Sequence, residues 1–321
     1  MKITNNLKER FTKDCKIPIK LYIEPYFTER INLLDKFYDT KSKWQAFVEM
    51  IEKFPNGEEY FTIFNSTKDA VIDFIKSRPA YIAFNQQDMN QFAVKNKNFP
   101  TKDIYKPTNI GRSFISIDMK KANFSSLRYY DASIFDNADT WEDFISKFTD
   151  NEFIINSKSI REVIMGNCNS GRVTTYEKFI TDQLLTLIIE AGIKPSNIVF
   201  FSNDEIVVDV TDLDITDITT TYDNIIKICD KFDVPFRAEI FRLLAVTKND
   251  KVVGYIKHMS DGSYDFKCFN NQDLLFTLRM LIGEDIKDSD LVFENDKCLA
   301  TYMTKPEIKL ITKGIVNEKN M

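Results

Sequence analysis

The sequence predicts an α+β protein whose central part is a ferredoxin-like β-α-β-β-α-β sheet. Residues 114–119 read FISIDM, in which apolar and polar side chains alternate as in a half-buried strand. Residues 198–210 hold two apolar, β-branched runs around a polar tip, the pattern of a tight hairpin. Helical periodicity fills the segment between these strands and the segment after the hairpin, so the elements follow the order of the split motif.

Residues 1–110 predict a mixed α/β region ahead of this sheet. Its expected elements are helices over 27–40 and 42–54, a strand over 60–64, a helix over 66–79 and a strand over 81–84. The polar stretch 95–112 contains two prolines and reads as the connection to the second region.

Residues 111–250 carry the predicted sheet. After the strand over 114–119 we expect helices over 125–130, 140–148 and 174–192, the hairpin over 198–210, a helix over 220–232 and a strand over 236–246. Residues 251–321 predict a C-terminal extension. It comprises strands over 251–259 and 264–269, a helix over 271–283, a strand pair over 291–303 and a charged tail.

Composition narrows the possible chemistry. The 321 residues are 43% hydrophobic and 28% charged, as in an ordinary globular protein, with a net charge of −5. No apolar run of about 18 residues is present, and the N-terminus lacks a secretory h-region, so we expect a cytoplasmic protein without a membrane span. The five cysteines form no CxxC pair, and His258 is the only histidine, which excludes zinc sites built on several histidines.

Any catalysis therefore falls to carboxylates and a hard metal ion. Asp118 closes one predicted strand, and Asp204 and Glu205 cap the hairpin that should lie beside it. Two aspartates on adjacent strands, holding two divalent ions about 4 Å apart, suit in-line nucleotidyl transfer. An acidic surface turn is the alternative for Asp204 and Glu205.

These segments resemble the palm domain of nucleic-acid polymerases. SNDEIVVDV (202–210) resembles motif C of family A DNA polymerases, and FISIDMKKANFSSLRYY (114–130) is similar to motif A. Ser170-Gly171-x-x-x-Thr175 is similar to motif B of viral RNA-dependent polymerases, whereas the Arg-Lys-Tyr-Gly pattern of family A is missing. The resemblance covers roughly residues 113–247, and residues 1–110 would occupy the fingers position.

The resemblance implies roles for individual residues. Asp118 and Asp204 would bind Mg²⁺ or Mn²⁺, and Glu205 would support them. Asn123 stands where family A has Glu and reverse transcriptases have an aromatic residue, and Phe124 beside it is a candidate ribose gate.

Basic residues between the two motifs are candidates for binding substrate. Lys158 and Arg161 share a helical face, where they are placed to grip a triphosphate, and Arg172 is a further substrate-binding candidate.

The sequence therefore predicts a metal-dependent nucleotidyltransferase that extends a nucleic-acid end from nucleoside triphosphates: a small polymerase, primase or terminal transferase. The abundance of Lys, Asn, Ile, Asp and Phe fits an AT-rich genome such as that of a bacteriophage or virus. Two alternatives remain: a palm-like module that binds nucleic acid or protein without chemistry, and a nucleotide cyclase or phosphodiesterase using the same two aspartates.

Overall fold

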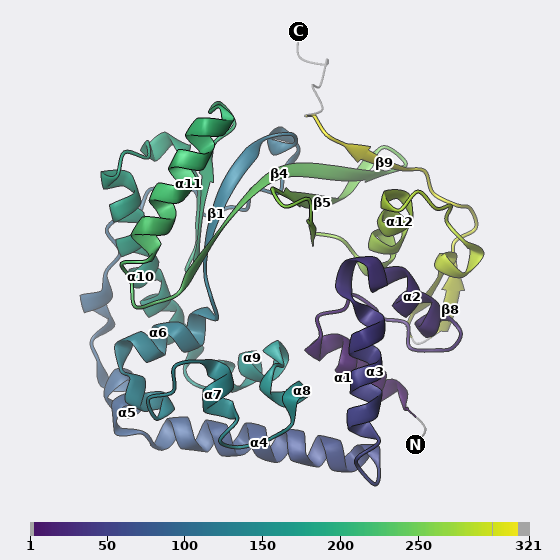
Figure 1. Cartoon of the computed structure of the whole chain (residues 1–321), viewed down its shortest axis with the longest axis horizontal. Helices are drawn as coiled ribbons and strands as arrows, with labels where there is room; N and C mark the ends of the chain where they lie inside the picture. Colours follow the sequence, from purple (N-terminus) through teal and green to yellow (C-terminus); the bar gives the residue numbers. More distant parts are fainter. Residues whose placement is uncertain (1–2, 297, 314–321) are drawn as a thin grey trace.

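An antiparallel sheet of seven strands lies at the centre of the fold, in a computed structural model that describes residues 3–296 and 298–313. The strands of this sheet are β1 (Ser113–Met119), β2 (Ile198–Phe201), β3 (Glu205–Asp209), β4 (Phe236–Lys248), β5 (Lys251–Met259), β6 (Tyr264–Lys267) and β9 (Ile308–Ile311). Their order is β2-β3-β1-β4-β5-β6. Strand β9 pairs with the end of β4 (Figure 1). A separate hairpin joins β7 (Val292–Asn295) to β8 (Cys298–Thr301). The predicted strands over residues 111–303 are thereby confirmed.

Twelve α-helices accompany the strands in the described part of the chain. They are α1 (Asn5–Asp14), α2 (Tyr26–Tyr38), α3 (Thr40–Ile51), α4 (Gly57–Ser77), α5 (Pro79–Gln86), α6 (Ala122–Tyr130), α7 (Trp141–Ile145), α8 (Glu152–Ile155), α9 (Lys158–Gly166), α10 (Ser170–Glu190), α11 (Ile215–Cys229) and α12 (Asn271–Leu281). The protein is therefore of the α+β class, as predicted.

The strands predicted within residues 1–110 are wrong. Residues 60–64 lie inside α4 and residues 81–84 lie inside α5. The side chains that α4 buries include Tyr60, Phe64, Val71 and Ile75, at the spacing of one face of a helix. A short apolar run fits both a strand and a helix. Here the helical spacing of the buried residues continues along the whole of α4, so the segment is helical. Among the described residues, this region holds helices and connecting segments and contributes no strand to a sheet.

Helices α10 and α11 cover one face of the sheet (Figure 1). Ile115 and Ile117 of β1 and Ile206 of β3 pack there against apolar side chains of both helices, including Leu184 and Ile225. Side chains alternate along each strand, so Ser116 and Asp118 project to the opposite face. Residues of the connecting segment 95–112 cover part of that second face, where Ile104 and Ile110 pack near Phe114 and Phe241. At the end of β1 that carries Asp118, the side chains on this second face are polar or charged.

The first and last parts of the chain lie side by side. Helix α2 packs on α12, and the Arg30 guanidinium donates a hydrogen bond of 2.6 Å to the Val292 carbonyl (Figure 1). Residues from all three predicted regions share one hydrophobic cluster, for example Leu7, Phe124 and Leu278. The predicted boundaries near residues 110 and 250 therefore do not separate independent cores. None of the helices described here is both long and apolar enough to cross a membrane.

Candidate active site

Asp118 stands near the end of β1, between two charged residues of the neighbouring strands. It is directly opposite Glu205 on β3 and Arg237 on β4. Directly opposed residues of antiparallel strands project from the same face of the sheet. The next backbone amide, that of Met119, donates a hydrogen bond of 2.8 Å to the carbonyl of Asp204 in the hairpin turn. The end of β1 and the hairpin tip are thus joined, as the sequence predicts.

Asp118 and Asp204 line a cavity of about 650 Å³. Its walls come from the end of α1, the loop between β1 and α6, helices α7, α9 and α10, the hairpin turn and β4. The lining residues are Asp14, Cys15, Lys16, Asp118, Met119, Lys120, Lys121, Ala122, Asn123, Glu142, Asn156, Lys158, Arg161, Glu162, Glu177, Asp204 and Arg237. The fold therefore brings acidic and basic side chains from distant parts of the sequence to one hollow.

One end of this cavity is acidic. Burial, together with the nearby carboxylates of Asp204 and Glu205, raises the pKa of Asp118 to about 6 against the opposing effect of Arg237. Arg237 lies 3.6 Å from the Asp118 carboxylate. Burial and the charge of Asp204 together raise the pKa of Glu177 on α10 to about 7. Neighbouring carboxylates repel each other when they are ionised, and a bound cation would reduce this repulsion.

The other end is basic. Lys16 follows α1, and burial together with the charges of Lys158 and Arg161 lowers its pKa to about 8. Burial also lowers the pKa of the Arg161 guanidinium, whose Nε is buried without a hydrogen-bond partner among the described residues. Lys158 forms an ion pair of 3.1 Å with Glu162. Three cations crowded into a partly buried site provide a binding place for a multiply charged anion.

Local interactions explain why α1 and α9 meet at this end. Ser157 caps α9 by accepting a hydrogen bond from the Ile160 N–H, and its hydroxyl donates to Asp14 at the end of α1. Asp14 also accepts a hydrogen bond of 2.7 Å from Arg10. The buried carboxylate of Asp14 is therefore satisfied by protein groups, and it fixes α9 with Lys158 and Arg161 on its first turn.

Helix α10 holds the hairpin turn in place. The Lys178 ammonium donates hydrogen bonds to the carbonyls of Phe201 and Ser202, at 3.0 and 2.9 Å, and lies over the Phe201 ring. The Thr181 hydroxyl donates to the carbonyl of Asn203 at 2.7 Å. Together these donors satisfy three successive carbonyls before Asp204, which orients the turn toward β1.

Of the residues predicted from the sequence, five line the cavity: Asp118, Asn123, Lys158, Arg161 and Asp204. The other three are placed elsewhere.

Glu205 faces the same side of the sheet as Asp118 but does not line the cavity. Its carboxylate accepts a hydrogen bond from Ser116 and lies 3.6 Å from the Lys257 ammonium. Glu205 is thus engaged by protein groups, in keeping with a supporting position.

Phe124 and Arg172 are used in packing. The Phe124 ring is buried, 4.6 Å from the Phe135 ring, because the first turn of α6 directs it into the core. The Arg172 guanidinium donates to the carbonyls of Phe84 and Gln87, and so secures the end of α5. Neither residue lines the cavity, so the ribose-gate role of Phe124 and the substrate contact of Arg172 stay predictions that the cavity does not support.

Sequence reasoning missed Lys16 and Glu177. Lys16 lies outside every motif, and only the packing of α1 on α9 brings it to the site. A signal for Glu177 was present, because it occupies the buried stripe of α10 that also contains Val173, Ile180 and Leu184. An acidic residue at such a position marks a buried charge.

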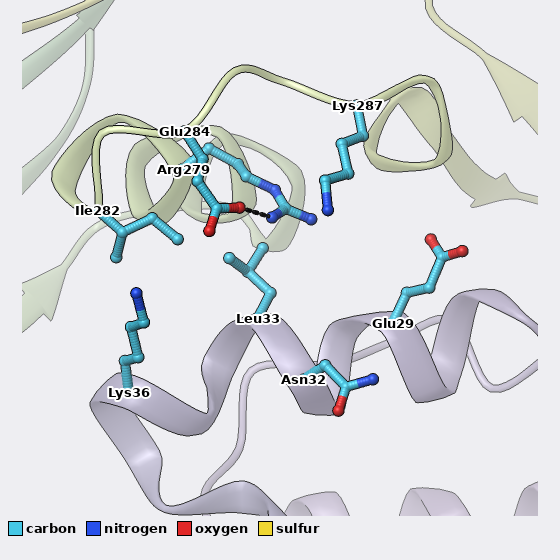
Figure 2. Close-up of a pocket in the computed structure, with 8 residues that line it drawn as sticks. All are labelled: Glu29, Asn32, Leu33, Lys36, Arg279, Ile282, Glu284 and Lys287. Carbon is cyan, nitrogen blue, oxygen red and sulfur yellow. Dashed lines mark hydrogen bonds and ion pairs between the residues drawn. The ribbon is translucent and has the colours of Figure 1, made fainter.

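A second pocket, of about 290 Å³, lies between α2 and the segment that follows α12 (Figure 2). Leu33 of α2 and Ile282 form its apolar part, and Arg279 is bound there by Glu284 at 2.5 Å. None of the predicted site residues lines it. This pocket lies where the first and last parts of the chain pack against each other.

Within residues 3–296 and 298–313, no group of three or more His, Cys, Asp or Glu side chains is arranged to hold a metal ion ready-made. The carboxylates of the acidic end repel one another, so their side chains would have to draw together as a cation binds.

No protein-family model matches this chain, and none of the curated proteins matches it either.

Proposed function

We propose that this protein is a metal-dependent nucleotidyltransferase of polymerase type, which extends a nucleic-acid end from nucleoside triphosphates. The observation that carries the proposal is the division of one cavity into an acidic end, with Asp118 and Asp204, and a basic end, with Lys16, Lys158 and Arg161. A nucleoside triphosphate and its divalent cation need these two environments side by side.

We further propose that β1 to β4 form a palm sheet of ferredoxin-like topology. The antiparallel order β2-β3-β1-β4, with helices between β1 and β2 and between β3 and β4, supports this assignment. In such a palm, residues 3–110 would stand in the place of the fingers, built from helices. We place the enzyme in a cytoplasm, that of the host if the chain is viral or from a bacteriophage.

The donor set fits a hard cation. Asp118 and Asp204 offer carboxylate oxygens, the ligands that Mg²⁺ and Mn²⁺ prefer, and burial, together with the charges of Asp204 and Glu205, raises the pKa of Asp118. When bound there, a divalent cation would lower the pKa of the attacking hydroxyl and neutralise charge on the leaving pyrophosphate.

The remaining chemistry belongs to side chains of the protein. Lys158, Arg161 and Lys16 would bind the triphosphate oxygens and hold the reacting phosphate in line with the primer end. Asn123 lines the cavity beside Asp118 and would donate a hydrogen bond to the sugar. Arg237, which also pairs with Glu239 at 3.1 Å, limits the negative charge at the acidic end before substrate enters.

Primer extension tests the proposal. Labelled primer–template is incubated with nucleoside triphosphates and Mg²⁺ or Mn²⁺, and the rate is compared among wild type, Asp118→Asn and Asp204→Asn. Both variants keep the shape of the side chain and remove its charge, and each should lower the rate by at least about 100-fold. The matched control is Asp265→Asn, on β6 of the same sheet but outside the cavity, which should extend at the wild-type rate. Extension that survives both cavity substitutions would remove Asp118 and Asp204 as the site.

A binding module without chemistry is the second candidate. It is favoured by the finding that no three acidic side chains in the described residues stand ready to hold a cation. In that case the protein would bind nucleic acid with an affinity that falls steeply as salt rises, and would show no turnover with either metal.

A further inference from the structure

Glu177 is an exception among the buried acidic residues of this protein. Its side chain is almost fully buried, with 7% of the residue exposed, and it lines the cavity next to Asp204. Within the described residues its carboxylate accepts no hydrogen bond and forms no ion pair within 4 Å. A carboxylate so largely removed from water, and without a protein donor, is costly to ionise.

Each of the other buried acidic residues has a donor or a cationic partner within the protein. Asp14 is bound by Arg10, Asp182 by the N–H groups of Lys95 and Asn96, Asp209 by Arg112, Asp273 by Lys248 and Asp290 by Arg279. The fold thus supplies a donor wherever it buries an acid for structural reasons. It supplies none to Glu177, and the cavity is where a partner can reach that side chain.

The neighbouring donors of α10 are not free to serve as that partner. Lys178 is bound to the carbonyls of Phe201 and Ser202, and Thr181 is bound to the carbonyl of Asn203. The charged group that acts on Glu177 from the hairpin is Asp204, which carries the same sign. A positive charge that enters from the cavity would supply the partner that the described residues do not.

We propose that Glu177 is a third carboxylate ligand of a divalent-cation site, joining Asp118 of β1 and Asp204 of the hairpin. The ligand class is a small hard cation, Mg²⁺ or Mn²⁺, because the available donors are all carboxylate oxygens. The inference rests on the proposed function for the roles of Asp118 and Asp204. It adds a ligand from α10, the helix that also holds the hairpin turn, so that cation binding would join the sheet to this helix.

Mn²⁺ binding to the full chain tests the inference without any turnover. Free Mn²⁺ is measured by electron paramagnetic resonance during titration, with no nucleotide or primer present. Glu177→Gln should weaken Mn²⁺ binding by about tenfold or more. The control is Glu190→Gln, the same substitution at an exposed position of the same helix, which should bind Mn²⁺ like wild type. Glu177→Asp, which keeps the charge on a shorter side chain, should bind more tightly than Glu177→Gln.

The outcomes separate this inference from the proposed function. If Glu177→Gln and Glu177→Asp both bind Mn²⁺ like wild type while Asp118→Asn binds it weakly, the role of Glu177 is overturned and the proposed function stands. If Glu177→Gln and Asp118→Asn both bind weakly but wild type extends no primer, the cation site is supported and the polymerase function is overturned. If wild type binds no Mn²⁺, the inference is overturned whatever the extension assay shows.

Discussion

Asp118 and Glu205 lie directly opposite each other on β1 and β3, and yet their carboxylates have different surroundings. Asp118 opens into the cavity, whereas Glu205 is turned to Ser116 and to the ammonium group of Lys257. Lys257 is buried and also lies over the Phe241 ring. Each acid thus has a cation 3.6 Å away, but Glu205 also accepts a side-chain hydrogen bond, whereas Asp118 faces the cavity.

This relationship predicts that Lys257 and Glu205 are coupled in stability. Lys257→Met leaves Glu205 without its cation in a partly buried place, and we expect it to lower the free energy of unfolding by about 2 kcal/mol. Glu205→Gln in the same chain removes the orphaned charge, so the double variant should be more stable than Lys257→Met alone. Urea denaturation of the two single variants and the double variant gives the coupling energy. Strictly additive effects would contradict the pairing.

The strands of the site were predictable because their pattern is local. Apolar and polar side chains alternate around Asp118, and apolar runs flank Asp204, because each strand has one buried face and one open face. In the sheet, β1 and β3 are neighbours, as the order of the elements along the chain predicts. The prediction of a strand over residues 60–64 is wrong because a five-residue apolar run fits the period of a strand as well as that of a helix. These residues belong to α4, whose buried side chains continue at helical spacing to Ile75.

The basic end was only half predictable. Lys158 and Arg161 share one helical face, which a sequence shows directly. Lys16 joins them through the contact of α1 with α9, and a contact between helices more than 140 residues apart leaves no periodic signal. Phe124 and Arg172 lie near the motifs and have suitable side chains, but their side chains contact the rest of the protein instead of the cavity. Phe124 packs on Phe135, and Arg172 donates to the Phe84 carbonyl.

The different placements of Arg172 and Arg161 predict opposite effects of the same substitution. Arg172→Ala leaves the Gln87 carbonyl without a donor and removes one of the two donors to the Phe84 carbonyl, so it should lower the free energy of unfolding by about 2 kcal/mol and leave the KM for nucleotide unchanged. Arg161→Ala removes a cavity cation and should raise that KM about tenfold. Thermal unfolding and steady-state extension kinetics check the pair. A higher KM for Arg172→Ala would return that residue to the substrate site.

Glu177 predicts a pH dependence of stability in the metal-free protein. Its pKa is about 7 in the folded chain against an ordinary value of 4.5, so the folded state holds a proton that the unfolded state has lost. The associated stabilisation is complete below pH 4.5 and disappears as the pH rises through about 7, a change of about 3 kcal/mol. Glu177→Gln cannot ionise and should lack this decline.

Urea unfolding at pH 5 and pH 8 with a chelator present measures that difference. Glu177→Gln should gain stability over wild type at pH 8 and lose the advantage at pH 5, whereas Glu190→Gln should follow wild type at both values. Equal pH dependence in wild type and Glu177→Gln would show that the Glu177 carboxylate is compensated in some other way.

Lys16 predicts how anion binding responds to alkaline pH. Burial and the charges of Lys158 and Arg161 lower its pKa to about 8, so the ammonium group loses its proton near that pH in the free protein. Inorganic tripolyphosphate should bind more weakly at pH 9 than at pH 7, because one of three cations is then neutral. Lys16→Met should bind it about tenfold more weakly at pH 7 and show a smaller change between the two pH values.

Isothermal titration calorimetry measures these affinities, with Lys20→Met as the control, since Lys20 is exposed and lies outside the cavity. If Lys16→Met keeps the full wild-type loss of affinity between pH 7 and pH 9, the titrating group is another residue and Lys16 is not part of the anion site.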